Sequence, residues 1–188
     1  MRTSACGAAC VVALAALGAP ASANLISNPG FEDTSAWSLY FTLGDDFGFS
    51  TDTAHSGTGS FRFGEAVDAA HVFQPVALVS GQEYELSFWV HNLGVGDDYL
   101  GVFILGVQIG PDNVPLLEGI VGTGLESWEQ VTLNFTVPAG DFSYLSFRGA
   151  DNIAGFYIDD ISLTAVPTPG AGSLGGLAAI ALAGRRRR

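Results

Sequence analysis

The chain has 188 residues, of which 48% are hydrophobic, nineteen are acidic and seven are basic. Only Arg62 and Arg148 are basic between residues 24 and 165, and all nineteen acidic residues fall in that segment, so its net charge is −17. This charge opposes binding to nucleic acid or to an anionic lipid surface. The segment has the length of one domain and is long enough to bury a core.

The first 23 residues have the composition of a secretory signal peptide. Arg2 gives it a positive start, residues 11–17 are apolar, and the small residues at 21–23 form a cleavage site. Both cysteines, Cys6 and Cys10, lie in this peptide. The mature chain, beginning at Asn24, is therefore expected to contain no disulfide, thiol nucleophile or cysteine-based zinc site. We expect an exported protein.

The segment 24–165 is predicted to be all-β, because turn residues recur at short intervals and no helical repeat is sustained. The clearest strand is 83–90, where apolar residues at 84, 86, 88 and 90 alternate with residues at 85, 87 and 89. In chain order the predicted strands are 37–43, 60–64, 71–78, 83–90, 99–105, 131–137, 144–147 and 156–164. This number of strands predicts an antiparallel, two-sheet β-sandwich of the jelly-roll type.

Five sequence landmarks, in order, resemble a known family of domains. They are the segments 24–32 (NLISNPGFE), 55–62 (HSGTGSFR), 73–90, 127–138 and 155–163 (GFYIDDISL). Together they are similar to the galactose-binding-like jelly rolls of carbohydrate-binding modules, the type of module families 4, 9 and 22. The resemblance implies a non-catalytic domain that binds extracellular polysaccharide, although the same fold also serves other functions.

The resemblance also implies a structural Ca²⁺ site. In the family, a glutamate of the first landmark and an aspartate of the last lie side by side and bind the ion together with backbone carbonyls. The matching residues here are Glu32 and either Asp159 or Asp160, with Asp160 preferred, because strand alternation does not decide between the two aspartates. Carbonyls near Asn28 and in the loop 55–59 would complete the oxygen ligands that Ca²⁺ requires. The alternative is a pair of solvated acids at strand ends.

A sugar-binding surface is expected where aromatic rings and polar groups share one face. On the strand 83–90, Trp89 lies opposite the core residues, and the following strand 99–105 shows matching alternation. The predicted concave sugar-binding face consists of Trp89, His91, Tyr99, Phe103 and Arg148. In the alternative interpretation Trp89 only covers one sheet. The other tryptophans, Trp37 and Trp128, are expected in the core.

The end of the chain resembles the PEP-CTERM class of bacterial sorting signals. A proline motif precedes a Gly-rich apolar run at 170–184, which is short for a membrane span, and a terminal arginine cluster follows. Thr168 stands where the family's motif has glutamate. The residues assigned to sorting are Val166, Pro167, Pro169, Arg185, Arg186, Arg187 and Arg188. The resemblance implies an exosortase-like sorting enzyme as a partner and transient membrane association through the segment 166–188. It also implies a protein of a bacterial envelope, at the cell surface or outside the cell. The alternative is a C-terminal anchor that is never processed.

The sequence shows no catalytic motif, so we expect that the protein is not an enzyme. The doublets Asp45-Asp46 and Asp97-Asp98 cannot act as a glycosidase pair, because adjacent carboxylates cannot face each other across a glycosidic bond. The first hypothesis is a surface-sorted module that binds polysaccharide. A structural or adhesive matrix domain without a sugar pocket is the alternative, and a small glycoside hydrolase is a less favoured one.

Overall fold

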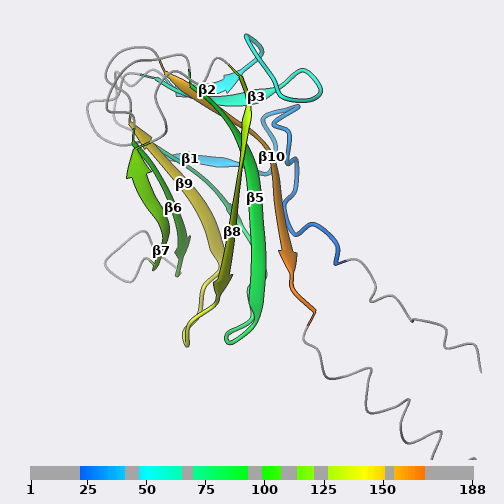
Figure 1. Cartoon of the computed structure of the whole chain (residues 1–188), viewed down its shortest axis with the longest axis vertical. Coiled ribbons are helices and arrows are strands. Elements are labelled where there is room, and N and C mark those ends of the chain that lie inside the picture. The colour runs from blue at the N-terminus through cyan, green and yellow to red at the C-terminus, as the bar shows by residue number, and fades with distance from the viewer. Residues whose placement is uncertain are drawn as a thin grey trace, which may run out of the picture.

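A computed structural model describes residues 22–40, 47–64, 70–92, 99–106, 114–120, 127–150 and 155–167. Their ten strands form two five-stranded antiparallel sheets that face each other (Figure 1). Sheet A has the order β1-β4-β9-β6-β7, and sheet B has the order β2-β3-β10-β5-β8. The predicted all-β, two-sheet sandwich is confirmed.

The ten strands divide equally between the two sheets. Sheet A consists of β1 (Ser38–Tyr40), β4 (Ala70–Pro75), β9 (Tyr144–Ala150), β6 (Tyr99–Leu105) and β7 (Val114–Ile120). Sheet B consists of β2 (Phe47–Ser50), β3 (Ser60–Phe63), β10 (Phe156–Ala165), β5 (Glu83–Asn92) and β8 (Glu129–Thr136). The eight predicted strands are present among them, although β1 is described only to Tyr40, whereas β2 and β7 were not predicted.

Side-chain alternation on β5 explains the position of the core. Leu86 and Phe88 are fully buried between the sheets, whereas Glu83 and Glu85 are exposed. Phe88 meets Phe147 of sheet A, with ring centroids 5.1 Å apart, so the two sheets contact each other through aromatic rings. With no cysteine among the described residues, the stability of the sandwich rests on this apolar burial.

A β-bulge interrupts the alternation of β10. Phe156 and Ile158 point into the core before the bulge, and Ile161 and Leu163 point into it afterwards. The register against β5 shifts between Asp159 and Ser162, and Asp160 has a φ of 48°. The extra residue brings two consecutive aspartates to the same side, which is why simple alternation could not choose between them.

The first described segment runs along the last strand. The Leu25 amide donates to the Leu163 carbonyl at 2.8 Å, and the Ile161 amide donates to the Pro29 carbonyl at 3.0 Å. Figure 1 shows this blue segment beside β10, with both ends of the domain leaving on the same side. Near the other end, the Val166 amide still binds the Glu83 carbonyl.

Much of the predicted targeting apparatus lies outside the described residues. These parts are the signal peptide up to residue 21 and the tail from residue 168 onward, including Pro169 and the four terminal arginines. Val166 and Pro167 are described and follow β10 directly. Within the described ranges, no helix is long and apolar enough to cross a membrane.

Candidate functional site

Three carboxylates converge beside Gly30, where the first landmark meets the bulge of β10. A side-chain carbon placed on Gly30 would lie 3.5 Å from an Asp160 oxygen and 3.6 Å from oxygens of both Asp159 and Glu32. Gly30 itself is buried. The absence of a side chain at this position therefore leaves a small space that is bordered by three acidic groups.

Backbone amides of the loop 53–59 hold two of these carboxylates. Glu32 accepts hydrogen bonds from the Thr58 amide and hydroxyl and from the Gly59 amide, and these bonds lower the pKa of its carboxyl. Asp159 accepts from the amides of His55 and Ser56 at 2.7 and 3.2 Å. Asp159 is fully buried, and burial raises the pKa of its carboxyl to about 6.

Asp160 binds the side chains of the same loop. One of its oxygens lies 2.6 Å from His55 Nδ1, and the other accepts the Ser56 hydroxyl at 2.7 Å. The backbone around the cluster adopts unusual conformations: Asn28, Phe31 and Asp160 have φ values of 49°, 53° and 48°. Such a conformation costs about 1–3 kcal/mol in a residue such as Phe31, and it is concentrated at functional sites.

The donor set of the cluster fits a hard cation. Ca²⁺ takes six to eight oxygens, from carboxylates and carbonyls alike, and three carboxylates without a cation would repel one another. Among the described residues, no group of three or more His, Cys, Asp or Glu side chains is arranged to hold a metal ion as the structure stands. The carboxylates instead face the donors of the loop 53–59 and Asp160's own backbone amide. The predicted ligands are nevertheless brought together around one point, and both aspartates belong to the cluster.

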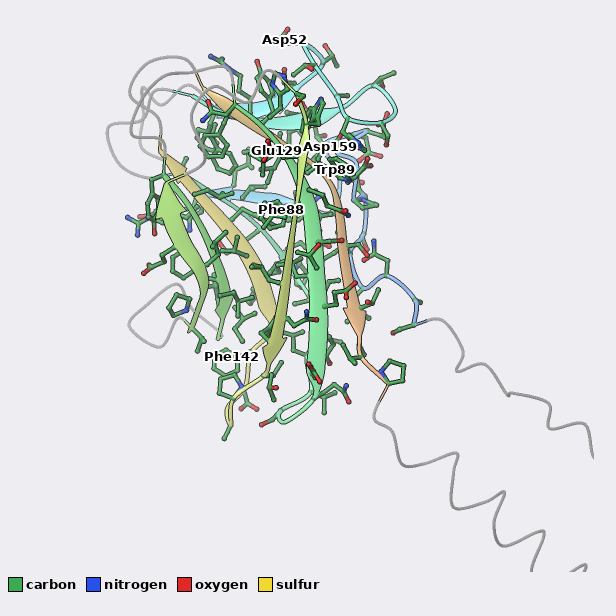
Figure 2. All side chains as sticks on the ribbon, viewed as in Figure 1. Asp52, Phe88, Trp89, Glu129, Phe142 and Asp159 are labelled. Atoms are coloured by element: carbon green, nitrogen blue, oxygen red, sulfur yellow. The ribbon has the colours of Figure 1, made fainter. Side chains whose placement is uncertain are left out.

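Trp89 lies on the outer face of sheet B, beneath the same loop. The His55 ring stacks on it with a centroid separation of 3.8 Å and an interplanar angle of 13°. Figure 2 shows Trp89 next to Asp159, with which it is in register across β5 and β10. Because His55 covers one face of the indole, that face is not available to a sugar ring in this structure.

His91 and Trp128 extend this aromatic group. Their rings lie 5.3 Å apart, and Trp128 also approaches His55 at 5.8 Å. Trp37 is buried, as predicted, and its indole donates to the Asn28 carbonyl at 2.9 Å. The prediction for Trp128 was wrong, because it is only half-buried and is not part of the core cluster. Trp128 precedes the edge strand β8, so its side chain can pack outside the sandwich.

The other three predicted ligand residues lie on the outer face of sheet A. Tyr99 and Phe103 both lean over Gly101: a side-chain carbon on Gly101 would lie 2.8 Å from the Tyr99 hydroxyl and 2.5 Å from the Phe103 ring. The Arg148 guanidinium lies 5.8 Å from the centre of the Tyr99 ring. Tyr99 and Arg148 are half-buried, whereas Phe103 is only 7% exposed. Two aromatic rings and a cation are thus gathered at one place.

Three residues that sequence reasoning missed complete this face. Strand register places His71, Arg148, Gly101 and Glu118 in one row across sheet A. Glu118 accepts a hydrogen bond from the Tyr99 hydroxyl at 3.3 Å, and Tyr40, which is 60% exposed, packs edge-on against His71. Burial, with a smaller contribution from Arg148, lowers the pKa of His71 to about 4. Only the order of the strands in the sheet reveals this row.

The five predicted ligand residues therefore do not form a single site. Tyr99, Phe103 and Arg148 belong to sheet A, whereas Trp89 and His91 belong to sheet B. Both groups point away from the shared core, so the sandwich separates them. We name the first group, with His71 and Glu118, the sheet A face.

Comparison with known proteins identifies the architecture. No protein-family model matches the sequence, and no curated protein matches it. The xylan-binding CBM22-1 domain of Paenibacillus barcinonensis Xyn10C superimposes with a TM-score of 0.57 at 16% identity, covering 80% of this chain and 99% of that one. The domain has the fold of a carbohydrate-binding module. At this level of identity, the similarity establishes the fold alone.

Two other structures with this fold have different roles. A cleaved adhesin domain of Lys-gingipain from Porphyromonas gingivalis has a TM-score of 0.60 at 17% identity, covering 76% of this chain and 99% of that one. The enzymatically active domain of tailspike protein 4 of bacteriophage CBA120 has a TM-score of 0.57 at 21% identity. The match covers 76% of this chain but only 21% of the tailspike chain. The carbohydrate-binding-module fold thus occurs in binding, adhesive and enzymatic proteins, and the site must decide among them.

Proposed function

We propose that the protein is an exported, non-catalytic domain that binds neutral polysaccharide through the sheet A face. The observation that carries the proposal is the gathering of Tyr99 and Phe103 over Gly101, beside Arg148. Aromatic rings can stack against the apolar faces of sugar rings, and a guanidinium donates hydrogen bonds to hydroxyls. The net charge of −17 between residues 24 and 165 favours a neutral glycan over a polyanion.

The surroundings of Tyr99 keep its hydroxyl protonated, so it donates to Glu118 while its oxygen can accept a hydrogen bond from a sugar hydroxyl. Burial, followed by the nearby Glu118 carboxylate, raises the pKa of Tyr99. Within the described ranges, Arg148 forms no ion pair, and its Nε has no hydrogen-bond partner. The guanidinium charge of Arg148 is thus not neutralised by an ion pair within these ranges, and this leaves it for a ligand on the sheet A face.

A Ca²⁺ ion is proposed as a structural component held by Glu32, Asp159 and Asp160. A bound ion would offset the mutual repulsion of the carboxylates and fasten the first landmark to the bulge of β10. The cluster and the sheet A face belong to different parts of the sandwich. The ion is therefore assigned to stability and not to the sugar contact.

Export and sorting complete the proposal. The signal peptide at 1–23 would direct secretion, and the segment 166–188 would associate transiently with the membrane and be recognised by an exosortase-like enzyme. This segment follows β10 directly, because Val166 is still hydrogen-bonded to Glu83 and Pro167 comes next. The domain would thus be displayed at the cell surface or in the extracellular matrix.

A structural or adhesive matrix domain without a sugar pocket is the second candidate. It is favoured by the burial of Phe103, which is only 7% exposed and so offers little of its ring to a ligand. In this case Tyr99 and Arg148 would contact a protein partner instead. A comparison of two variants separates the candidates.

Replacing Tyr99 should weaken polysaccharide binding, whereas replacing Trp89 should not. We expect Tyr99→Ala to lower the affinity for a bound neutral glycan roughly tenfold or more, because aromatic anchors carry much of a binding free energy. Trp89→Ala is the matched control, since it removes an aromatic ring from the opposite sheet. Affinity electrophoresis of the full chain in gels containing xylan or β-1,4-galactan measures both effects. Equal retardation of Tyr99→Ala and the unmodified chain would refute the assignment of this face.

A further inference from the structure

A separate pocket opens on sheet B, at its β2 edge. It has a volume of about 170 Å³ and is lined by Phe47, Gly48, Phe49, Ser50, Asp52 and Arg62. This is room for several waters, the scale of one small polar ligand. In Figure 2, Asp52 lies on the loop at the end of the sandwich farthest from Phe142. The pocket lies on the sheet that does not carry the sheet A face.

Arg62 is the cationic residue among those that line the pocket. Arg62 is in register with Gly48 on one side and with Tyr157 on the other. Its side chain lies against Gly155, where an added side-chain carbon would be 3.2 Å from the Arg62 Nε. Arg62 also makes a further interaction within the protein. Nothing lies within 4 Å of the side-chain position of Gly48, which leaves the pocket open above it.

The polar groups of the pocket match a ligand with several hydroxyls. Arg62 can only donate hydrogen bonds, the Asp52 carboxylate can only accept them, and the Ser50 hydroxyl can do both. A neutral sugar presents groups that donate and accept at neighbouring positions. An anion would be repelled by Asp52 and by the net charge of the segment, and an apolar ligand would remove the Asp52 carboxylate from water without offering it a hydrogen bond.

We propose that this pocket is a second carbohydrate site, which takes a single neutral sugar unit such as the end of a glycan chain. With the sheet A face on the other side of the sandwich, one domain could then hold two polysaccharide chains at once and cross-link them. The cross-linking part rests on the proposed function, whereas occupancy of the Arg62 pocket does not.

Arginine side-chain NMR tests the pocket directly. Arg62 and Arg148 are the only arginines between residues 24 and 165, so Arg62→Lys and Arg148→Lys assign their Nε–H signals. The full chain is titrated with D-glucose, D-galactose, D-xylose and D-mannose. We expect at least one sugar to shift the Arg62 signal. Asp52→Asn should lower the affinity for that sugar roughly tenfold, because it converts a charged acceptor into an amide. Glu83→Gln, an exposed change of the same kind on sheet B, should leave the affinity unchanged.

The outcomes separate this inference from the proposed function. If no sugar shifts the Arg62 signal, or if the Asp52→Asn variant binds as well as the unmodified chain, the proposal that this pocket binds a sugar is refuted. If polysaccharide shifts the Arg148 signal in the same sample, binding at the sheet A face is supported independently of the pocket. Turbidity of a soluble polysaccharide then tests cross-linking: the unmodified chain should aggregate it, and Arg62→Gln should not. Aggregation that survives in Arg62→Gln would also refute the second site.

Discussion

Calcium should raise the unfolding temperature of the full chain by roughly 5–10 °C over a sample in chelator. An ion that binds only the folded state at a hundred times its Kd adds about 2.7 kcal/mol, and each kcal/mol shifts the Tm of a chain of this size by about 2–4 °C. The physical source is the carboxylate cluster, where Glu32, Asp159 and Asp160 lie around Gly30. Scanning calorimetry with calcium and with chelator measures the shift.

Two variants show whether the shift arises at this cluster. Glu32→Gln removes one carboxylate while an amide oxygen still accepts from Thr58, so the calcium-dependent shift should largely disappear. Glu85→Gln removes an equal charge from an exposed position on β5 and should retain the shift. Identical unfolding temperatures in calcium and in chelator would contradict the metal site. A shift that persists in Glu32→Gln would place the ion elsewhere.

Acidification from pH 7 to pH 4 should lower the free energy of unfolding by up to about 3 kcal/mol because of the proton equilibrium of His71. The pKa of His71 is lowered from 6.5 to about 4, first by burial and then by Arg148. Between these values the unfolded chain binds a proton that the folded chain does not. The stability contributed by His71 is therefore fully present above the unfolded pKa and is lost as the pH falls toward 4, by about 1.4 kcal/mol per pH unit in this interval.

Comparison with His71→Gln isolates this contribution from other groups. Asp159, whose pKa is raised to about 6, acts in the opposite direction, because its buried charge destabilises the fold as the pH rises. Urea unfolding at pH 4 and pH 7, in chelator, should show a smaller acid loss for His71→Gln than for the unmodified chain. The amide of glutamine still offers a partner to the Ser146 hydroxyl, which lies 3.2 Å from His71 Nδ1. If the unfolding free energies of the two proteins fall in parallel with pH, the claim that His71 is neutral in the folded chain is ruled out.

The fold was accessible from sequence because its signals are local. Alternation on the strand 83–90 correctly assigned Leu86 and Phe88 to the core and Trp89 to the other face. The two strands that the sequence did not predict, β2 and β7, have weaker local signals. β2 is the four-residue edge strand FGFS, with glycine inside it, and β7 contains Pro115 and Gly119, two residues that weaken a strand signal.

The site was predictable only in part because strand order is not a local property. The strand of Trp89 and the strand of Tyr99 follow each other in sequence, but β5 pairs with β10 and β8, whereas β6 pairs with β9 and β7. The chain therefore passes from one sheet to the other between them. The same non-local pairing creates the row of His71, Arg148 and Glu118, in which no two residues are close in sequence.

The carboxylate cluster depends on a further non-local feature. Glu32 was paired with Asp159 or Asp160 through the family resemblance, but the bulge that brings both aspartates to the cluster and the His55 ring that covers Trp89 appear only in three dimensions. Loop 53–59 reaches across the end of sheet B and binds the two aspartates and Glu32. Neither periodicity nor composition specifies where such a loop will lie.

Binding of the unmodified full chain to polysaccharides, in calcium, tests the central claim most directly. Affinity electrophoresis against a broad panel, including xylan, β-1,4-galactan and soluble cellulose derivatives, should show retardation by at least one neutral glycan. Arg148→Ala should weaken that retardation, since the guanidinium is assigned to the sugar hydroxyls. A folded chain with a sharp unfolding transition that no neutral polysaccharide retards would contradict the account and favour the matrix domain.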